Sequence, residues 1–365
     1  MCNGFSLYLD QIHHHMAGRP VKLIIENDES DPGTAVRKLY KFLDEDKVNV
    51  ISGFLFSHVL YAVTPVAEKY KMPTVDAISG ADDVTQRKKS KYVLRTSRSA
   101  SQASHALGEY VKNKLGYKRV VMIAADYPYG YEVVGGFQQS FEEAGGKVIQ
   151  KLWAPMGLSD FSYLFKNIRK DADAIFMCTV GPQSEIVYGQ YEKSGLKLPL
   201  LGTETSFDES FYQHLGNGIV GGISANCYSV ALNTPENKKF VQQYMEKYGA
   251  DPNLYAENSY TAAKWIHKAV ESLHGHVEDR DKFLAALRAT QLTDDPRGPI
   301  KLDAYGNAVQ NIYIRKVERV KGKLQNTVIY TYPMVSQFWK YNPEKYMKQP
   351  PYSRDYPPCV NCSSR

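Results

Sequence analysis

Segments with the periodicity of a strand alternate with segments that have the periodicity of a helix along most of this 365-residue chain. The apolar run VNVISG, residues 48–53, is followed by Val59, Ala62, Val63 and Val66, which match the spacing of a helix lying on a core. Strands that alternate with helices pair in parallel and carry helices on both faces of the sheet. We therefore expect an α/β protein with doubly wound sheets.

The alternation occurs in two series, which predicts two lobes. In the first series we expect helices near 1–12, 36–43 and 59–66, and strands at 21–28, 48–53 and 73–77. In the second series we expect strands at 119–126, 147–155, 171–180, 198–204 and 221–229, with helices at 130–144, 161–168 and 183–195. Two further helices follow residue 235, and residues 311–320 and 324–332 resemble antiparallel strands joined at a Lys-Gly-Lys turn.

The front of the chain departs from this pattern, because the first helix begins at residue 1 with no strand before it. We expect that an edge strand and its loop are missing there, through a truncated chain or a gene model begun at an internal methionine. A neighbouring strand, residues 21–28 or 48–53, would then present unpaired backbone groups. The first lobe should accordingly be the less stable one.

Composition excludes several classes of protein. The chain has 45 basic and 39 acidic residues, and its densest basic run, Arg87-Lys88-Lys89, lacks the flanking aromatic residues of a nucleic-acid surface. No apolar run approaches the roughly 20 residues of a membrane span, and no signal peptide is recognisable at the amino end. We therefore expect no nucleic-acid partner and no membrane insertion.

The five cysteines are too few and too scattered for a disulfide framework. Cys178 lies in the apolar run AIFMCTV, and we expect it and Cys227 to be buried. Cys359 and Cys362 form a CxxC pair, but a zinc site needs two more ligands and nothing nearby supplies them. A disulfide or two free thiols is expected there, and no metal site.

Ligands of open α/β sheets bind outside the carboxyl ends of the strands. The loops at those positions carry Phe56-Ser57, Ile78-Ser79-Gly80, Tyr127–Tyr129, Thr179–Pro182 and Glu204-Thr205. The chain has no GxGxxG, no GxxxxGK[ST], no GxSxG and no HExxH motif. His58 beside Ser57 is adjacent in sequence and points elsewhere on a helix, so we expect neither an enzyme nor a cofactor.

Ser57 precedes the helical pattern that begins at Val59. It could cap its own helix, or it could join the unpaired N–H groups of the helix start in holding an anion. The residues alone leave both interpretations open.

A set of motifs in order gives a more specific indication: NGFSLYLDQI, VKLIIENDESDP, VISGFLFS, RTS, ADYPYG, FEEAGGKV, SDFSYLFKNI, LLGTE, NIYIRKV and VSQFW. Over residues 1–340 their spacing resembles the leucine/isoleucine/valine-binding-protein family, the type I periplasmic substrate-binding proteins of ABC transporters. The resemblance implies two lobes joined by three crossovers near 98, 230 and 306. The lobes would be 1–98 with 230–305 and 99–229 with 306–345, followed by an extended tail, 346–365. It also implies that the family's usual opening strand is absent.

The resemblance further implies a ligand site. Ser57 and a backbone N–H near Ile78 or Ser79 would hold a ligand carboxylate, and Tyr129 would contact the ligand from the second lobe. Glu204 would receive an ammonium group, unless it caps a helix at 207–215. Tyr255 would line the pocket, unless it packs in the core. The full set of expected ligand-binding positions is Phe56, Ser57, Ile78, Ser79, Gly80, Tyr129, Val180, Gly181, Glu204 and Tyr255.

Two departures bear on the ligand. Gly80 stands where amino-acid binders of the family often have threonine, and Val180 or Gly181 stands where they have an aromatic residue. We expect a periplasmic solute-binding protein that delivers a branched-chain amino acid or a related small carboxylate to ABC permease subunits. The alternatives are an aromatic, benzoate-like acid as ligand, a ligand-sensing regulator with the same fold, and an enzyme on a doubly wound fold.

Overall fold

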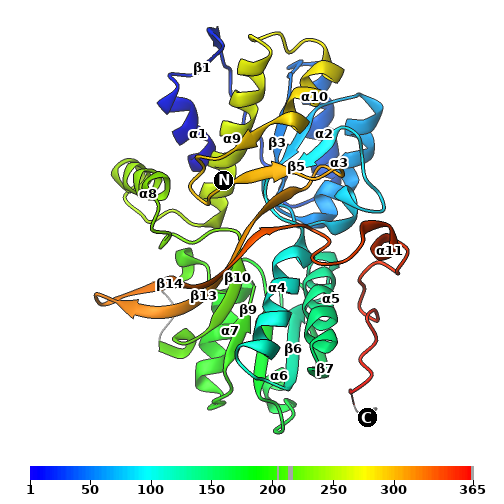
Figure 1. Cartoon of the computed structure of the whole chain (residues 1–365), viewed down its shortest axis with the longest axis vertical. Coiled ribbons are helices and arrows are strands. Elements are labelled where there is room, and N and C mark those ends of the chain that lie inside the picture. Colours follow the sequence, from blue (N-terminus) through cyan, green and yellow to red (C-terminus); the bar gives the residue numbers. More distant parts are fainter. Residues whose placement is uncertain (204, 213–216, 363–365) are drawn as a thin grey trace. The chain divides into compact units, whose positions relative to one another are not determined.

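A computed structural model describes residues 1–203, 205–212 and 217–362 (Figure 1). The chain divides into two compact units. Unit 1 comprises Met1–Ser99 and Thr234–Asn311, and unit 2 comprises Ala100–Asn233 and Ile312–Arg365. Both units combine β-sheet with helices, so the predicted α/β class is confirmed.

Unit 1 is built on a parallel three-stranded sheet in the order β3-β4-β5. Its strands are β1 (His15–Met16), β2 (Arg19–Pro20), β3 (Ile51–Gly53), β4 (Thr74–Asp76), β5 (Val93–Arg95), β11 (Gln291–Leu292) and β12 (Ile300–Leu302). Its helices are α1 (Cys2–Gln11), α2 (Pro32–Asp44), α3 (Ser57–Lys69), η1 (Asp82–Thr85), α8 (Pro235–Tyr248), α9 (Leu254–Ser272) and α10 (Arg280–Ala289).

Local sequence explains where these helices begin and how closely they pack. Asp31 caps α2 by accepting a hydrogen bond from the Thr34 N–H at 2.7 Å, and Pro32 occupies the first helical turn, where its missing N–H has no consequence. Gly4 brings α1 against α9, since a Cβ at this position would stand 1.8 Å from the carbonyl oxygen of Ala256. The first helix of the chain therefore depends on a helix 250 residues later for its packing.

The predicted strand at residues 21–28 is wrong. The structure assigns no strand to this segment, and Ile25 is 56% exposed. Among the described strands, β3 pairs with β4 alone, so no strand stands between β3 and this segment. A run with strand-like composition adopts a ladder only when a partner offers complementary N–H and C=O groups.

Unit 2 contains a larger sheet in the order β13-β10-β9-β8-β6-β7, with β10 antiparallel to β13 and the other pairs parallel. Its strands are β6 (Arg119–Ala125), β7 (Lys147–Ala154), β8 (Ala174–Cys178), β9 (Leu200–Gly202), β10 (Ile223–Asn226), β13 (Ala308–Val320) and β14 (Lys323–Val335). Its helices are α4 (Ala100–Asn113), α5 (Pro128–Glu143), α6 (Ser162–Lys166), α7 (Pro182–Lys193), η2 (Glu209–Phe211), η3 (Asn217–Ile219) and α11 (Pro343–Met347). The first residues of β13 belong to unit 1, where they pair with β12.

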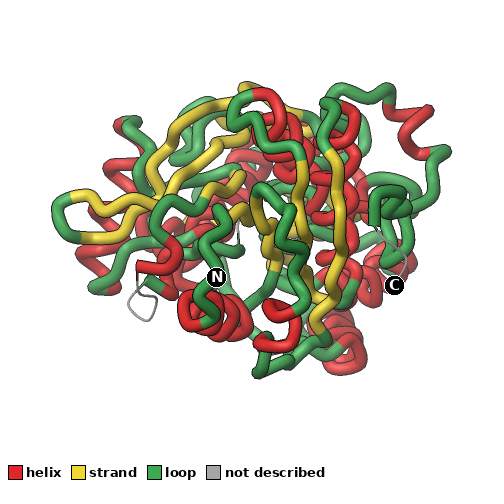
Figure 2. The backbone as a smooth tube through the Cα atoms, turned by 90° about the horizontal axis from the view of Figure 1, so that it is seen from below, coloured by secondary structure: helices red, strands yellow, loops and turns green. Residues whose placement is uncertain are grey.

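The predicted antiparallel pair near the end of the chain is confirmed. β13 and β14 run side by side as a long hairpin that ends in a short turn (Figures 1 and 2). Lys321 and Gly322 both have positive φ, 49° and 83°, as a two-residue turn between twisted strands requires.

The cysteines agree with their predicted roles. Cys178 and Cys227 are buried free thiols, and Cys359 and Cys362 form a disulfide, one of the two expected alternatives. Apart from α11, the described part of the tail, to residue 362, is irregular, and the ring of Tyr352 packs against Gly135 of α5. In the part of the chain that is described, no helix has the length and apolar character needed to cross a membrane.

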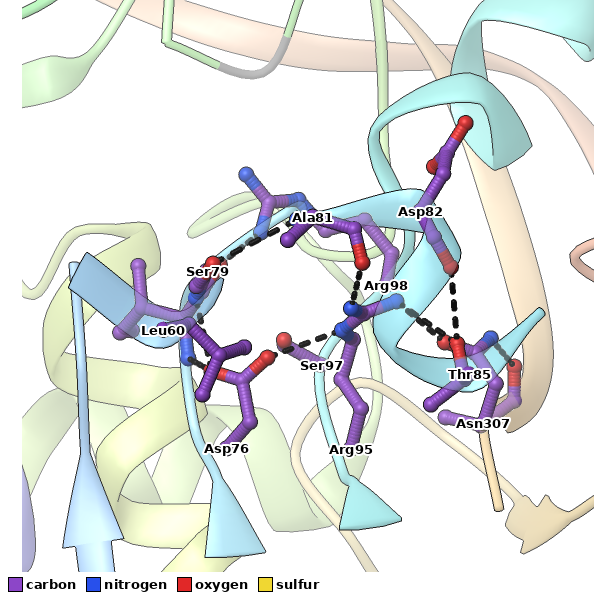
Figure 3. A network of polar contacts seen from close by, with 12 residues as sticks. Leu60, Asp76, Ser79, Ala81, Asp82, Thr85, Arg95, Ser97, Arg98 and Asn307 are labelled. Atoms are coloured by element: carbon purple, nitrogen blue, oxygen red, sulfur yellow. Dashed lines mark hydrogen bonds and ion pairs between the residues drawn. The ribbon is translucent and has the colours of Figure 1, made fainter. Parts of the chain in front are cut away.

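A buried ion pair ties the strands of unit 1 together (Figure 3). The Nε of Arg95, at the end of β5, lies 2.9 Å from Oδ2 of Asp76, at the end of β4, and both side chains are completely buried. Arg95 also donates to the Thr85 hydroxyl of η1 at 3.1 Å, to Oδ1 of Asn307 at 2.9 Å and to the carbonyl of Ala81. One guanidinium thus fastens β4, β5, η1 and the turn before β13.

A second buried cluster lies on α9. The Thr261 hydroxyl is 3.0 Å from Oε1 of Glu257 and 3.0 Å from the Asp295 carboxylate. The Thr261 hydroxyl has one proton, so it can donate to only one of the two carboxyl groups. The contact with the other carboxyl group requires a proton on that group. Burial and the Asp295 charge raise the pKa of Glu257 to about 8, although the Arg297 guanidinium, with Nε 3.3 Å away, opposes the rise. Glu257 is therefore protonated at neutral pH.

We expect Asp76→Asn to lower the free energy of unfolding of unit 1 by about 3–5 kcal/mol, because it leaves the buried Arg95 charge uncompensated. Urea titration at pH 8 with a probe in unit 1 measures the change. Asp281→Asn is the matched control, because Asp281 pairs with Lys91 at the surface and such pairs contribute about 1 kcal/mol or less. Equal effects of the two variants would contradict this account of Arg95.

Unit 1 should lose stability as the pH rises from about 6, the pKa of Asp76 in the folded chain, to about 8. Glu257 has a pKa of about 8 in the folded chain, against about 4.3 when unfolded, so the folded state holds an extra proton in this interval. The slope attributable to one proton is at most about 1.4 kcal/mol per pH unit. Glu257→Gln should reduce the slope of the unfolding free energy against pH. Glu271 is an exposed carboxylate on the same helix, and Glu271→Gln should leave this slope unchanged. Unfolding midpoints in urea across the pH range decide between these results.

Candidate ligand-binding site

Ser57 is the first residue of α3, and the N-cap is Phe56, which provides no side-chain cap. The interpretation of Ser57 as the cap of its own helix is therefore wrong. Its side chain is 1% exposed, and its hydroxyl makes no hydrogen bond within the described parts of the chain. The Phe56 carbonyl accepts the first bonds of the helix, from Val59 and Leu60 at 3.1 Å each, so the N–H of Ser57 remains directed out of the helix start.

The loop after β4 is organised by Asp76. Its Oδ1 accepts hydrogen bonds from the N–H groups of Ile78 at 3.2 Å and Ser79 at 2.9 Å, and the Ser79 N–H also lies 3.0 Å from the carbonyl of Phe54 (Figure 3). The resemblance implies that one backbone N–H near Ile78 or Ser79 holds the ligand, but the N–H groups of both residues are engaged by the protein. The next residue, Gly80, is buried, and its N–H has no hydrogen bond among the described residues.

Burial raises the pKa of Asp76 to about 6, although Arg95 and the two loop N–H groups oppose the rise. The carboxylate is thus ionised at neutral pH and completes the ion pair described above. It also fixes the turn in which Gly80 is presented.

Strain and positive charge also mark this part of unit 1. Phe54 has a left-handed backbone, φ 67°, which is uncommon for a bulky residue and is found at functional loops. Arg98, with 2% of its side chain exposed, donates a hydrogen bond to the carbonyl of Ile78. Its guanidinium therefore lies against the loop that holds Ser79 and Gly80.

Parallel pairing of β3 and β4 brings the first group of candidate residues together. Phe56 and Ser57 follow β3, and Ile78, Ser79 and Gly80 follow β4, so both segments leave the same edge of the sheet. This edge offers the hydroxyl of Ser57 and the backbone N–H groups of Ser57 and Gly80. The guanidinium of Arg98 lies nearby. Such a set of donors is suited to an anion.

Tyr255 lies elsewhere in unit 1. It is the second residue of α9, is half-buried, and packs against the hydrophobic core that includes Trp265 and Ile266. This contact agrees with the core-packing alternative. The structure gives no reason to group Tyr255 with Ser57.

Unit 2 contributes a second group at the ends of its own parallel strands. Tyr129, the second residue of α5, is 4% exposed, and its ring centroid lies 6.0 Å from that of Tyr127. Val180 and Gly181 connect β8 to α7, and Gly181 has φ 55°, a conformation that suits glycine. β6 and β8 are neighbours in the sheet, so these residues emerge at one edge. Glu204, which follows β9 in the sequence, lies outside the described residues.

Sequence reasoning missed two residues that shape the loop. The periodicity places Asp76 only in a strand, and Arg98, which follows directly on the RTS motif, has no predicted role. The available signal was a charged residue at the end of an apolar strand, where an unpaired charge is costly to bury. The partner of each charge lies about 20 residues away, which the periodicity of a sequence does not reveal.

Comparison with known proteins identifies the family. Residues 1–323 match the model of the periplasmic binding protein family, Peripla_BP_6. Leu/Ile/Val-binding protein homolog 6 of Brucella abortus (strain 2308) is 27% identical over 341 residues, which cover 90% of this chain and 86% of the relative.

Two solved structures are also similar. A solute-binding protein of an ABC transporter from Rhodopseudomonas palustris BisB5, in complex with 3,4-dihydroxybenzoic acid, is 28% identical with a TM-score of 0.87, over 92% of this chain and 93% of that one. A leucine-binding protein from Thermotoga maritima is 25% identical with a TM-score of 0.82, over 91% and 93%. The resemblance drawn from the sequence motifs is confirmed. The chain belongs to the periplasmic binding protein family.

Proposed function

We propose that this chain binds a small carboxylate and delivers it to the permease subunits of an ABC transporter on the outer side of the cytoplasmic membrane. Its family consists of solute-binding proteins, which are not enzymes. The proposal assigns the carboxylate to the edge of unit 1 that carries Ser57 and Gly80. Tyr129, Val180, Gly181 and Glu204 of unit 2 are further candidate ligand-binding residues.

The observation that carries the proposal is the state of Ser57. A buried hydroxyl without a hydrogen bond costs about 1–3 kcal/mol, and a bound water or a ligand group can remove this cost. The positive end of the α3 dipole and the nearby Arg98 favour a negative charge at this place. A carboxylate satisfies the Ser57 hydroxyl and complements this potential.

Two ligand classes remain candidates, each supported by a relative. The Leu/Ile/Val-binding homologues and the leucine-binding structure favour a branched-chain amino acid. The 3,4-dihydroxybenzoic acid complex, together with the aromatic side chains Phe56 and Tyr129 among the candidates, favours an aromatic acid. Gly80 supplies no hydroxyl for an ammonium group, which adds weight to the second class. Glu204 distinguishes the two, because an aromatic acid has no ammonium group to present.

We expect Ser57→Ala to weaken binding of the ligand carboxylate by roughly 1–3 kcal/mol, a 5-fold to 150-fold loss of affinity, without unfolding the chain. Isothermal calorimetry with leucine, isoleucine, valine, benzoate and 4-hydroxybenzoate measures it. Ser259→Ala is the control, because the Ser259 hydroxyl is also buried without a hydrogen bond in the described region but lies on α9. If the wild-type chain binds none of these carboxylates, the proposal fails. If Ser57→Ala binds as tightly as the wild type, Ser57 is removed from the site.

Glu204→Gln should lower the affinity for leucine by more than about tenfold, because leucine carries an ammonium group. The affinity for its deaminated analogue, 4-methylpentanoate, which has no ammonium group, should stay nearly the same. Competition binding with the two compounds on wild type and variant gives the ratio. Equal losses for both compounds would contradict an ammonium site at Glu204. A wild-type preference for benzoate over leucine would establish the aromatic class.

A further inference from the structure

Asp76 contacts both the loop of the proposed carboxylate site and a buried guanidinium (Figure 3). Its Oδ1 accepts the N–H groups of Ile78 and Ser79 at 3.2 and 2.9 Å, and its Oδ2 lies 2.9 Å from Nε of Arg95. The Asp76 side chain is completely buried. Both carboxylate oxygens are thus held by donors of the protein.

The backbone donor assigned to the ligand is the next one along the same turn. The N–H of Gly80 follows directly on the two N–H groups that Asp76 holds. A ligand carboxylate at Gly80 and the carboxylate of Asp76 are therefore bound by consecutive peptide groups. Two negative charges that share one site oppose each other's ionisation, so the bound ligand raises the pKa of Asp76.

Protonation of Asp76 changes the charge balance of this region. With Asp76 ionised, its pair with Arg95 carries no net charge. The other partners of Arg95 in the described structure are the Thr85 hydroxyl, the Asn307 amide and a backbone carbonyl, all of them neutral. With Asp76 protonated, the guanidinium charge is uncompensated, and an anion bound at the adjacent turn supplies the missing counter-charge.

Other charged and titratable side chains lie on the elements around Asp76 and Arg95. They are His58 of α3, Asp82 and Asp83 of η1, Arg87 after η1, Arg98 after β5, Glu257 of α9 with Asp295 and Arg297, and Asp303 before β13. β3 has no such side chain. Arg87 neutralises Asp83 at 2.8 Å. The Nη2 of Arg297 donates to the Thr96 carbonyl at 3.0 Å, which connects Glu257 to the end of β5.

We propose, on the basis of the carboxylate site assigned above, that Asp76 couples binding of the ligand carboxylate to the uptake of one proton, so that the affinity rises as the medium becomes more acidic. The proton comes from the medium when the ligand binds and returns to it on release. Asp76 is a positioning residue in this scheme, because it acts on the ligand through the turn and through Arg95.

Thermodynamic linkage gives the direction and the size of the effect. Burial raises the pKa of Asp76 to about 6, so the group exchanges its proton in a range where the ligand carboxylates stay ionised. If the bound ligand strengthens proton binding at Asp76 tenfold, the affinity rises about sevenfold between pH 8 and pH 5.5. Linkage then also requires the uptake of about half a proton for each ligand bound at pH 6.5.

The experiment is calorimetry on the full wild-type chain at pH 5.5, 6.5 and 8. The probe is the tightest binder among leucine, isoleucine, valine, benzoate and 4-hydroxybenzoate. At each pH the titration is made in two buffers of different ionisation enthalpy, and the difference in the measured heat gives the number of protons taken up. The carboxyl carbon resonance of Asp76, followed by NMR with and without the probe, identifies the group that binds the proton.

Asp76→Asn separates the coupling from a purely structural role. Asparagine is a neutral mimic of protonated aspartate, so this variant should bind the probe at pH 8 as tightly as the wild type binds it at pH 5.5, with no further change with pH. A purely structural role would weaken binding at every pH. If the variant does not fold, the wild-type proton count and the Asp76 resonance give the answer.

Two control variants test the other titratable groups. Histidine side chains commonly change charge between pH 5 and 8, and Glu257 also exchanges a proton near neutral pH. His58→Gln and Glu257→Gln should each keep the rise in affinity and the proton uptake.

Three results would overturn the proposal. Equal affinity at pH 5.5 and pH 8 without proton uptake removes the coupling and leaves the carboxylate site in place. Loss of the pH dependence in a control variant, with the Asp76 resonance unchanged by the probe, assigns the proton to another group. Weaker binding by folded Asp76→Asn at every pH leaves Asp76 with a structural role alone. A wild-type chain that binds none of the five carboxylates at any pH refutes the proposed function together with the coupling.

Discussion

The contact between Asp76 and Arg95 sets the conformation of unit 1 at the edge where its candidate site lies. Burying a guanidinium is expensive unless a carboxylate neutralises it and its other donors are satisfied. Arg95 meets both conditions through Asp76, Thr85, Asn307 and the carbonyl of Ala81. Because four segments of the chain supply these acceptors, none of them moves independently of the others.

The second oxygen of Asp76 extends this constraint to the loop. By accepting the N–H groups of Ile78 and Ser79, it leaves the Gly80 N–H as the backbone donor without a partner in the described loop. The Ser57 hydroxyl, at the end of the neighbouring strand, is left in the same condition. A preformed pair of donors binds an anion without first breaking internal hydrogen bonds, so less binding energy is spent on reorganisation.

The sequence predicted well those elements whose partners are close along the chain. The strand–helix succession of β3 and α3, and the hairpin of β13 and β14, follow from local periodicity and turn residues. Residues 21–28 show where this reasoning fails. Their composition favours a strand, but a strand also needs a neighbouring strand to pair with, and local composition does not reveal whether one is present. The predicted positions of Ser57 and Gly80 came from the order of elements and from the family. The engagement of Ile78 and Ser79 by Asp76 could not be read from either, since it depends on the orientation of one buried side chain.

The discontinuity of unit 1 has a consequence for its synthesis. Its first 99 residues cannot close their core until Trp265, Ile266 and the rest of Thr234–Asn311 have been made, and Gly4 cannot dock α1 until α9 exists. Residues 100–311 are 212 residues, and a ribosome adds roughly 5–20 residues each second, so the wait is on the order of 10–40 s. During that time the apolar faces of α1, α2 and α3 are exposed on the nascent chain. Unit 1 therefore stays open during this interval, and its exposed apolar faces are the surfaces that chaperones bind.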